Sequence, residues 1–305
     1  MTALPAQAQS VDWAVVAPPV ATAATAGAVL LADLVLGPAR RAVLGWISAA
    51  GLVVSFALLL PLVGTARSTF CLPGGPATYP SCSYRVDALT VAFQLLTVLA
   101  SLVVVLLSVG VLRDERLPAG EYWFLLLCSV TGALVLAAAR DLLTLVVALE
   151  VVTLPTYALV GLRRDDPRSS EAALKYFLVS VVSSALMLYG VALVYGTTGQ
   201  VLLDRVATAL SAPGQPSVAR AGVVLTVAGF AFKVAAVPFH VWAPDTYVGA
   251  PVPVAAYLSV VSKAAGFAGL LLVLAVAFPA YAGTWSPVVA VVAALTMTVG
   301  NVVAL

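Results

Sequence analysis

Charged residues are scarce in this sequence, and their scarcity excludes most classes of soluble protein. Only 9% of its 305 residues are charged, whereas 62% are hydrophobic and the mean hydropathy is +1.10. Soluble globular domains are usually about 45–50% apolar and about 25% charged. The net charge of +2 and the absence of any run of basic residues also argue against a protein that binds nucleic acid. The composition predicts an integral membrane protein.

Residues that bind metals and redox cofactors are also few. One histidine and three cysteines supply neither a set of metal ligands nor the ligands of haem or an iron–sulfur cluster. No glycine-rich phosphate-binding loop follows a strand-like segment. We therefore expect no cofactor in this chain, and any transport is driven by another protein or by an ion gradient.

Hydrophobic runs of about 20 residues, the length that crosses roughly 30 Å of hydrocarbon as a helix, recur along the sequence. The first run has no lysine or arginine before it and so lacks the positive region of a signal peptide, which predicts that it stays as a span. We expect an all-α, polytopic transmembrane helix bundle. Its spans, about nine in number, are placed at 14–36, 43–64, 87–111, 122–139, 141–162, 172–195, 220–239, 252–278 and 286–305.

Arginines divide unevenly between the two ends of these spans. If the N-terminus lies outside the cell, the cytoplasmic connections are short and hold Arg40, Arg41, Arg113, Arg116, Arg163, Arg164 and Arg168. The outer side then holds Arg67, Arg85, Arg140, Arg205 and Arg220. Because short cytoplasmic loops are enriched in positive charge, we expect a multi-pass protein of the cell membrane with its N-terminus outside.

The cysteines agree with this orientation. Cys71 and Cys82 flank the segment CLPGGPATYPSC, which the topology places outside, where disulfides persist. We expect these two cysteines to be linked, the alternative being two free thiols in a loop. Cys128 lies within a span and is expected to be a small hydrophobic core residue.

All three lysines, Lys175, Lys233 and Lys263, lie inside hydrophobic segments, together with one carboxylate, Glu150. A charged side chain in hydrocarbon costs several kcal/mol, so ionisable residues at this depth mark a pathway for charge by default. The pattern predicts translocation of protons or cations.

Two of these charges share a spacing with proline. Glu150 lies five residues before Pro155, and Lys233 lies five residues before Pro238. A helical proline leaves the carbonyl four residues earlier without its donor, and interrupted helices commonly form ion sites in transporters. We expect a discontinuous helix near residues 220–250. The alternative is that proline is simply common in membrane helices.

Two ionisable residues also have ordinary structural interpretations. Lys175 follows Glu171 by one turn, so it can pair with that carboxylate and reach water at the end of its span. His240, the only histidine, has an unperturbed pKa of about 6.5 and is suited to relay protons. It is equally suited to a hydrogen bond at a helix end.

Three segments carry a resemblance to a known family: ALEVVTLPTYALVGL with Glu150, EAALKYFLVSVVSSALMLYGVALVYGTTG with Lys175, and FAFKVAAVPFHVWAPDTYVGAPVPVAAYLSVVSKAAGF with Lys233 and Lys263. The sequence resembles the antiporter-like, proton-translocating membrane subunits of NADH-quinone oxidoreductase, respiratory complex I. The KYF-to-LYG segment and the ending SKAAGF are similar to the N-type subunits of bacteria, rather than to the L and M types or the multisubunit sodium/proton antiporters.

The resemblance implies a role for each residue. Glu150 and Lys233 match a coupling pair, Lys233 lying on a discontinuous helix. Lys175 matches a lysine that modulates the pair, Lys263 a central lysine that passes the proton on, and His240 a histidine after the helix break. It also implies that FMN, iron–sulfur clusters, NADH and quinone are bound by other subunits of the complex, with which this chain associates in the lipid bilayer.

The family has about fourteen helices in two inverted bundles, and this sequence ends at Leu305 within a hydrophobic run. We therefore expect a C-terminally truncated member. Its expected parts are N-terminal helices at 1–120, a proton-translocating bundle at 121–270 and the start of an incomplete second bundle at 271–305. A fragment, a frameshifted gene and a genuine short form are all compatible with this end.

The expected function is that of a proton-translocating membrane subunit, which couples electron transfer from NADH to quinone in other subunits to proton transport. The chain then belongs to a translocase without carrying a redox centre itself. One alternative is an Mrp-type or stand-alone cation/proton antiporter. A second alternative is a non-conducting subunit that supports assembly.

Overall fold

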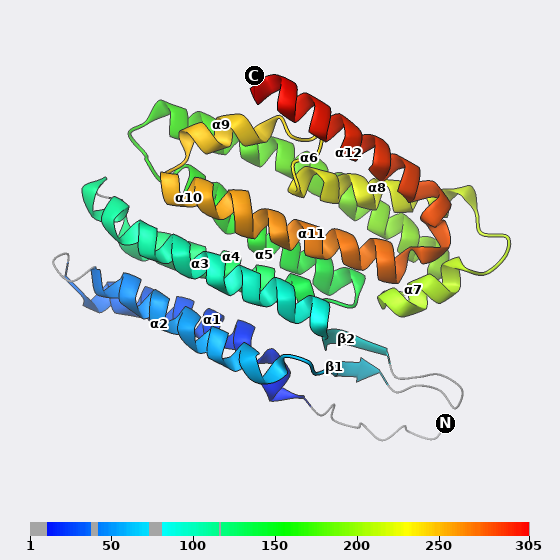
Figure 1. Ribbon diagram of the computed structural model, residues 1–305, viewed down its shortest axis with the longest axis horizontal. Helices are drawn as coiled ribbons and strands as arrows, with labels where there is room; N and C mark the ends of the chain where they lie inside the picture. Colours follow the sequence, from blue (N-terminus) through cyan, green and yellow to red (C-terminus); the bar gives the residue numbers. More distant parts are fainter. Residues whose placement is uncertain (1–10, 38–41, 73–80, 116, 305) are drawn as a thin grey trace.

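The computed structural model describes residues 11–37, 42–72, 81–115 and 117–304. In this part the chain is a bundle of long helices with a single two-stranded hairpin at one end (Figure 1). Among these described residues, eight helices are long and apolar enough to cross a membrane. The predicted all-α transmembrane bundle is confirmed. The span expected at 220–239 is the interrupted one, and its helix stops at Lys233.

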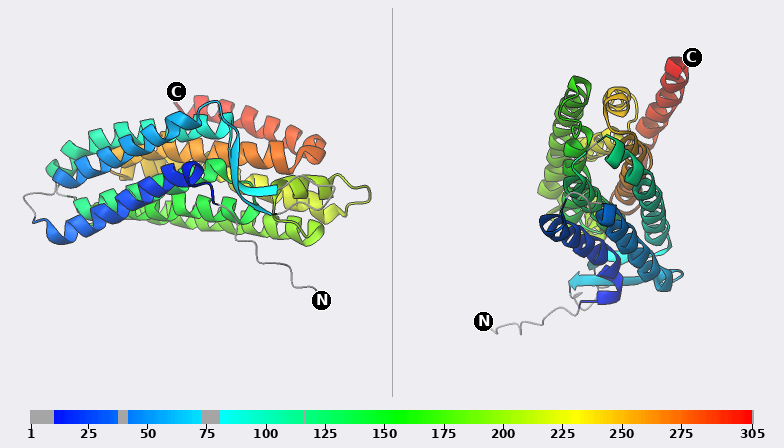
Figure 2. Two further views of the ribbon diagram at one scale, coloured as in Figure 1. Left: turned by 90° about the horizontal axis from the view of Figure 1, so that it is seen from below. Right: turned by 90° about the vertical axis from the view of Figure 1, so that its left-hand side faces the viewer.

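The N-terminal helices pack side by side along one flank of the bundle (Figures 1 and 2). They are α1 (Trp13–Val35), α2 (Ala42–Leu59), followed by the short 3-10 turn η2 (Leu60–Leu62), and α3 (Ala88–Asp114). Apolar residues surround each of these helices, as expected where one side faces lipid and the other faces protein. Helix α1 contacts both α2 and α4.

The central helix is α4 (Ala119–Ala138), and it packs closely on α5 (Leu142–Val160). The contact depends on Gly132, where a Cβ atom would lie 2.6 Å from the backbone nitrogen of Val152. Asp141 caps the start of α5 by accepting a hydrogen bond of 2.7 Å from the backbone N–H of Thr144, as aspartate commonly does at this position. The backbones of α4 and α5 therefore touch beside Glu150.

The longest helix, α6 (Pro167–Thr198), ends at Gly199 in the left-handed conformation and is followed by α7 (Leu203–Leu210). Helix α6 packs along α8 (Ser217–Lys233) and then along α9 (Trp242–Gly249). The residues between α8 and α9 leave the helical path, so these two short helices together form one discontinuous span (Figure 1). This break lies within the predicted region 220–250.

The next span runs without interruption from Val252 to Ala277. It consists of α10 (Val252–Tyr257), the π-helical turn η3 (Leu258–Ser262), α11 (Lys263–Leu272) and a second π-helical turn, η4 (Val273–Ala277). The 3-10 turn η5 (Pro279–Tyr281) leads into α12 (Ala282–Ala304). Figure 2 shows α12 in red at the edge of the bundle, and none of its described side chains is buried.

The hairpin of β1 (Arg67–Leu72) and β2 (Ser81–Val86) is antiparallel and pairs Cys71 with Cys82. The two cysteines form a disulfide with sulfur atoms 2.02 Å apart. The backbone N–H of Arg140 donates to the carbonyl of Ser83. The hairpin is thereby joined to the connection between α4 and α5.

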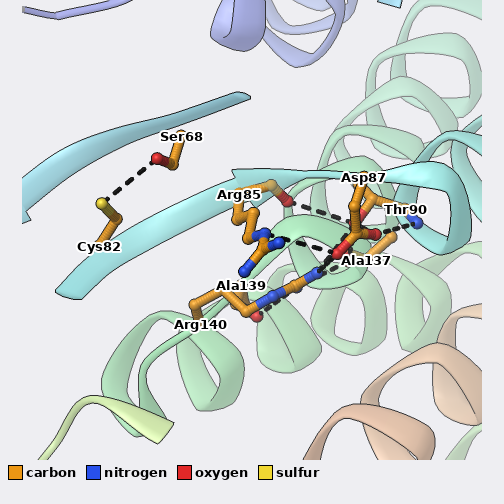
Figure 3. A network of polar contacts seen from close by, with 8 residues as sticks. All are labelled: Ser68, Cys82, Arg85, Asp87, Thr90, Ala137, Ala139 and Arg140. Carbon is orange, nitrogen blue, oxygen red and sulfur yellow. Dashed lines mark hydrogen bonds and ion pairs between the residues drawn. The ribbon is translucent and has the colours of Figure 1, made fainter. Parts of the chain in front are cut away.

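A polar network fixes this connection (Figure 3). Arg140 is 8% exposed, and its guanidinium donates to the Asp87 carboxylate at 2.9 Å and to Thr90 at 3.2 Å. Asp87 also caps α3 by accepting from the backbone N–H of Thr90. Burial alone raises the pKa of Asp87, but the hydrogen bonds from Thr90 and the charge of Arg140 outweigh burial and hold the pKa below its ordinary value.

The arginines used to predict the orientation separate to two ends of the bundle. Arg163 pairs with Glu115 and Arg164 with Glu121 at one end, whereas Arg140 lies beside the hairpin at the other. Three of the arginines, Arg40, Arg41 and Arg116, lie outside the described residues. Which end faces the cytoplasm stays a prediction.

Candidate functional site

Glu150 lies in the middle of α5 and faces α6. Its Oε1 accepts a hydrogen bond of 2.6 Å from the hydroxyl of Ser184. The glutamate is partly exposed, although neighbouring residues of α5 such as Leu149 and Val152 are buried. A carboxylate at this depth in a bilayer needs polar partners, and Ser184 supplies one of them.

Lys233 is the last residue of α8 and is only 2% exposed. Its ammonium donates a hydrogen bond of 2.8 Å to the hydroxyl of Thr153. That hydroxyl in turn donates to the carbonyl of Leu149 at 2.6 Å. Thr153 follows Glu150 by three residues, so both side chains lie on nearby parts of the α5 surface. The structure therefore brings Lys233 to the segment of α5 that carries Glu150, with Thr153 as its direct partner.

The stem of Lys233 is covered by α11. A Cβ atom on Gly266 would lie 2.9 Å from Cγ of Lys233 and 3.2 Å from its Cβ. Only a residue without a side chain allows the backbone of α11 to approach this closely. Gly266 lies three residues after Lys263, so the same helix carries the third lysine and encloses the second.

The helix break follows Lys233 at once. Ala235 has a φ of +57°, which is unusual for a residue other than glycine. The backbone N–H of Val237 donates to the hydroxyl of Thr296 on α12 at 2.9 Å. Pro155, in contrast, lies inside α5, which continues to Val160. The shared spacing thus marks an interrupted helix at Pro238 but an unbroken helix at Pro155, where packing against α4 holds α5 together.

Lys263 is the first residue of α11, directly after the π-helical turn η3. Such turns often occur at functional sites in helices. The ammonium of Lys263 lies 5.6 Å from the centre of the Tyr247 ring, within the range of a cation–π interaction. The hydroxyl of Tyr247 is buried and has no hydrogen-bond partner within the described part of the chain.

His240 lies within the break, two residues before the start of α9. Its Nδ1 atom is buried, again without a hydrogen-bond partner among the residues that the structure describes. Buried polar atoms usually have a partner. The hydrogen bond of Lys233 goes to Thr153 and does not involve the histidine, and the role of His240 as a proton relay stays a prediction.

Lys175 belongs to a different cluster from Glu150 and Lys233. Its ammonium lies 2.7 Å from Glu171 on its own helix and 2.6 Å from Asp245 on α9. The side chain is 47% exposed, in agreement with a lysine that reaches the end of its span. Arg168, Glu171, Lys175 and Asp245 line a shallow cavity of about 200 Å³.

Aromatic rings fill the space between the two clusters. Tyr176 stacks on Trp242 with ring centres 4.7 Å apart and on Phe232 with centres 6.4 Å apart. Tyr176 is adjacent in sequence to Lys175, and Phe232 is adjacent to Lys233. The hydroxyl of Tyr176 is 3.1 Å from that of Thr156. A largely apolar layer of stacked rings therefore lies between the cluster of Lys175 and that of Lys233.

Sequence reasoning missed Ser184, Thr153, Asp245 and Tyr247, which contact the ionisable residues. Asp245 and Tyr247 lie in the polar and aromatic stretch after Lys233, and the sequence does not show which residues of that stretch contact a lysine. Nothing in the local sequence distinguishes Ser184 and Thr153 from other hydroxyl residues of membrane helices. In the ranges that the structure describes, no group of three or more His, Cys, Asp or Glu is arranged to hold a metal ion.

Similarity to known proteins extends along the whole chain. The chain is 56% identical over 303 residues, 99% of its length, to NADH-quinone oxidoreductase subunit N 2 of Streptomyces griseus. It is 45% identical over 301 residues to NADH-quinone oxidoreductase subunit N of Salinispora tropica. In both comparisons it covers 56% of the relative. The chain therefore spans little more than half the length of these relatives.

A solved structure has the same fold. One chain of respiratory complex I from Thermus thermophilus with bound aureothin superposes with a TM-score of 0.73 at 35% identity, covering 94% of this chain and 58% of that one. The sequence model of the family described as "NADH:quinone oxidoreductase/Mrp antiporter, TM" matches residues 139–305. That match includes every lysine of the chain and Glu150, and it shows that the chain belongs to the NADH:quinone oxidoreductase/Mrp antiporter family of transmembrane proteins.

Proposed function

We propose that this chain translocates protons as part of a membrane subunit of an NADH-quinone oxidoreductase. The observation that carries the proposal is the burial of Lys233 at a helix break, where its ammonium is hydrogen-bonded to α5 one turn from Glu150. A lysine placed this deeply in a membrane protein is costly and is retained where it moves charge. The similarity to N-type subunits supports the same function.

The proposed proton path uses the contacts around Lys233. Thr153 fixes the ammonium, and the negative charge of Glu150 favours the protonated form of the lysine. Two unit charges 4 Å apart interact by about 4 kcal/mol at an effective dielectric constant of 20, and the attraction falls in proportion as the distance grows, so this value is an upper bound for Glu150 and Lys233. A proton that arrives at Lys263, on the helix whose Gly266 covers Lys233, opposes a charge on Lys233. Protonation of these two lysines is therefore coupled, which is what stepwise transfer requires.

The remaining parts of the assembly follow from this assignment. Other membrane subunits of the complex adjoin the chain in the cell membrane, and its N-terminus lies outside. Oxidation of NADH and reduction of quinone, with FMN and the iron–sulfur clusters, take place in other subunits. The chain then supplies ionisable side chains to the translocase and no redox centre.

A second candidate function is cation/proton antiport, because the family description includes Mrp antiporters. An antiporter exchanges protons for another cation down an imposed gradient and needs no NADH. Co-purification of the chain with flavin and iron–sulfur subunits supports the oxidoreductase. A sodium gradient that drives proton movement in membranes without NADH supports the antiporter.

The decisive experiment replaces Lys233 in the intact membrane complex of the source organism. Inverted membrane vesicles are supplied with NADH, and proton uptake is measured together with NADH oxidation. Lys233→Met is expected to lower proton uptake per NADH severalfold while the chain still assembles. Arg220→Gln, at the exposed start of the same helix, is the matched control and is expected to leave the ratio unchanged. A wild-type ratio in Lys233→Met rejects the proposed pathway.

A further inference from the structure

The short helix α9 contacts two of the lysines through side chains on opposite faces. Asp245 reaches Lys175 at 2.6 Å, and Tyr247 lies beneath the ammonium of Lys263 at 5.6 Å. Residues two apart on an α-helix point about 200° away from each other. This eight-residue helix therefore lies between a lysine of α6 and a lysine of α11.

Only one of the two carboxylates around Lys175 joins separate helices. Glu171 lies four residues before Lys175 on α6, so that pair stabilises α6 internally. Asp245 belongs to α9, and its bond to Lys175 ties α9 to α6. The two partners are almost equally distant from the ammonium, at 2.7 Å and 2.6 Å, and they differ in what they connect.

Helix α9 also lies flat against α6 at both of its ends. Near its start, Trp242 stacks on Tyr176 with ring centres 4.7 Å apart. At its end, a Cβ atom on Gly249 would lie 2.5 Å from Cβ of Ala172 and 2.7 Å from the carbonyl oxygen of Arg168. Both contacts leave little space between α9 and α6.

The opposite face of α9 is less firmly held. The hydroxyl of Tyr247 is buried and lacks a hydrogen-bond partner among the described residues, whereas its ring contacts Trp242 edge-on with centres 6.3 Å apart. Within the described ranges Lys263 forms no ion pair with a carboxylate, and the Tyr247 ring lies beside its ammonium. A small shift of α9 thus changes the surroundings of Lys263 directly.

We propose that α9 couples the ion pair of Lys175 to the charge of Lys263. Asp245 is the positioning residue, because it forms that ion pair with Lys175, and Tyr247 is the residue whose ring stabilises the charge of Lys263. The inference rests on the proposed proton pathway. While the Lys175–Asp245 bond is intact, α9 is held on α6 and the Tyr247 ring faces the Lys263 ammonium. When the bond is lost, α9 shifts and the ring no longer supports that charge.

The test compares the two carboxylates in the intact complex. Asp245→Asn removes the charge that joins α9 to α6, and Glu171→Gln is the matched control because it removes the equally close charge within α6. Asp245→Asn is expected to lower proton uptake per NADH by up to about fivefold, the range for an exposed ion pair. Glu171→Gln is expected to stay near wild type. Equal losses in the two variants overturn the proposal.

A charge swap and a double-mutant cycle separate transmission from simple support of the fold. Lys175→Asp combined with Asp245→Lys rebuilds the ion pair with its direction reversed and is expected to recover most of the uptake lost in Asp245→Asn. Tyr247→Leu and Asp245→Asn are expected to be non-additive, since they interrupt the same link. Failure of the swap in a complex that assembles normally, or simple additivity, contradicts a link through α9.

A labelling experiment distinguishes failure of this inference from failure of the proposed function. A small amine-reactive reagent is applied to the purified complex, and modification of the peptide that contains Lys263 is followed by mass spectrometry. Asp245→Asn is expected to change the labelling rate of Lys263 severalfold, and Glu171→Gln to leave it unchanged, whether or not protons are pumped. If the Lys233→Met complex pumps normally, the proposed proton pathway is rejected. The labelling experiment still tests whether α9 couples Lys175 to Lys263. Unchanged labelling in Asp245→Asn rejects the link alone.

Discussion

The ammonium of Lys233 is hydrogen-bonded to Thr153, 2.8 Å away, and not to Glu150. Thr153 and Glu150 both belong to α5, and the Glu150 carboxylate accepts a separate hydrogen bond from Ser184. The charges of the expected pair thus lie on adjoining surfaces, each bound by a hydroxyl group. An arrangement of this kind keeps the two charges within electrostatic reach while their distance stays adjustable, because hydroxyl groups can donate or accept.

Thr153→Val tests the role of this hydroxyl. Valine has nearly the same shape, so the fold is kept while the acceptor of the Lys233 ammonium is lost. We expect proton uptake per NADH to fall severalfold in inverted vesicles. Thr131→Val is the control, because the hydroxyl of Thr131 donates to the carbonyl of Leu127 on its own helix. Equal behaviour of the two variants contradicts a specific role of Thr153.

Glu150→Gln removes the negative charge and keeps an oxygen that accepts from Ser184. We expect normal amounts of assembled complex and a severalfold lower proton uptake per NADH, because the attraction to Lys233 is lost. Lys175→Met is expected to have a milder effect than Lys233→Met. Vesicle assays of proton uptake against NADH oxidation measure both, and normal uptake in Glu150→Gln and Lys233→Met together dismisses the pair as a functional unit.

Gly266→Ala introduces a Cβ atom 2.9 Å from Cγ of Lys233. Either α11 or the lysine must move, and we expect a loss of about 1–3 kcal/mol, as for other overpacked cores. The thermal midpoint of the purified protein in detergent reports this loss. Gly110→Ala serves as the control, since its Cβ would meet nothing within 4 Å. A Gly266→Ala protein as stable as Gly110→Ala shows that the site adapts without cost.

Removal of Arg140 tests the network in Figure 3. Arg140→Met leaves Asp87 without its ion-pair partner, and we expect a loss of about 1–3 kcal/mol at neutral pH, less than for a fully buried pair because Asp87 is 29% exposed. Since the folded state lowers the pKa of Asp87, this stabilisation is present above the unfolded pKa and disappears as the pH falls through the folded one. The free energies of unfolding of the wild type and the variant are therefore expected to converge as the pH falls. A difference that does not change with pH contradicts a stabilising ion pair between Arg140 and Asp87.

The link between Cys71 and Cys82 is tested by a peptide map without reductant. The two cysteines are 11 residues apart in the sequence. In the loop-entropy model, a disulfide that closes a loop of this length stabilises the folded state by about 3 kcal/mol. We expect the two cysteines in one cross-linked peptide. A membrane-impermeant thiol reagent is expected to label them in intact cells only after reduction. Labelling without reductant excludes the bond, and absence of labelling after reduction contradicts the predicted orientation.

The sequence was sufficient to predict the helical membrane bundle because hydrophobic runs of the required length leave few alternatives. The proline five residues after Lys233 also predicted the region of the break, whereas the role of Lys233 in transport stays a prediction. Local patterns do not report which helix faces which, and this is why Thr153 and Ser184 were not foreseen. The same limit concealed Asp245, whose importance depends on the packing of α9 against α6.

Pro155 illustrates the opposite case, in which the same local pattern leads to a different structure. The spacing to Glu150 equals the spacing between Lys233 and Pro238, yet α5 continues through its proline. The difference lies outside the motif, because Gly132 lets the backbone of α4 press against Val151 and Val152. Tertiary contact therefore decides whether a proline in a membrane helix interrupts it.

The hydrogen bond from Val237 to Thr296 has a consequence for the order in which the protein is built. The donor belongs to the break between α8 and α9, and the acceptor follows it in the chain by 59 residues. A backbone N–H without a partner in hydrocarbon costs several kcal/mol. We therefore expect the break to become fully hydrogen-bonded only after α12 has entered the membrane and packed beside it.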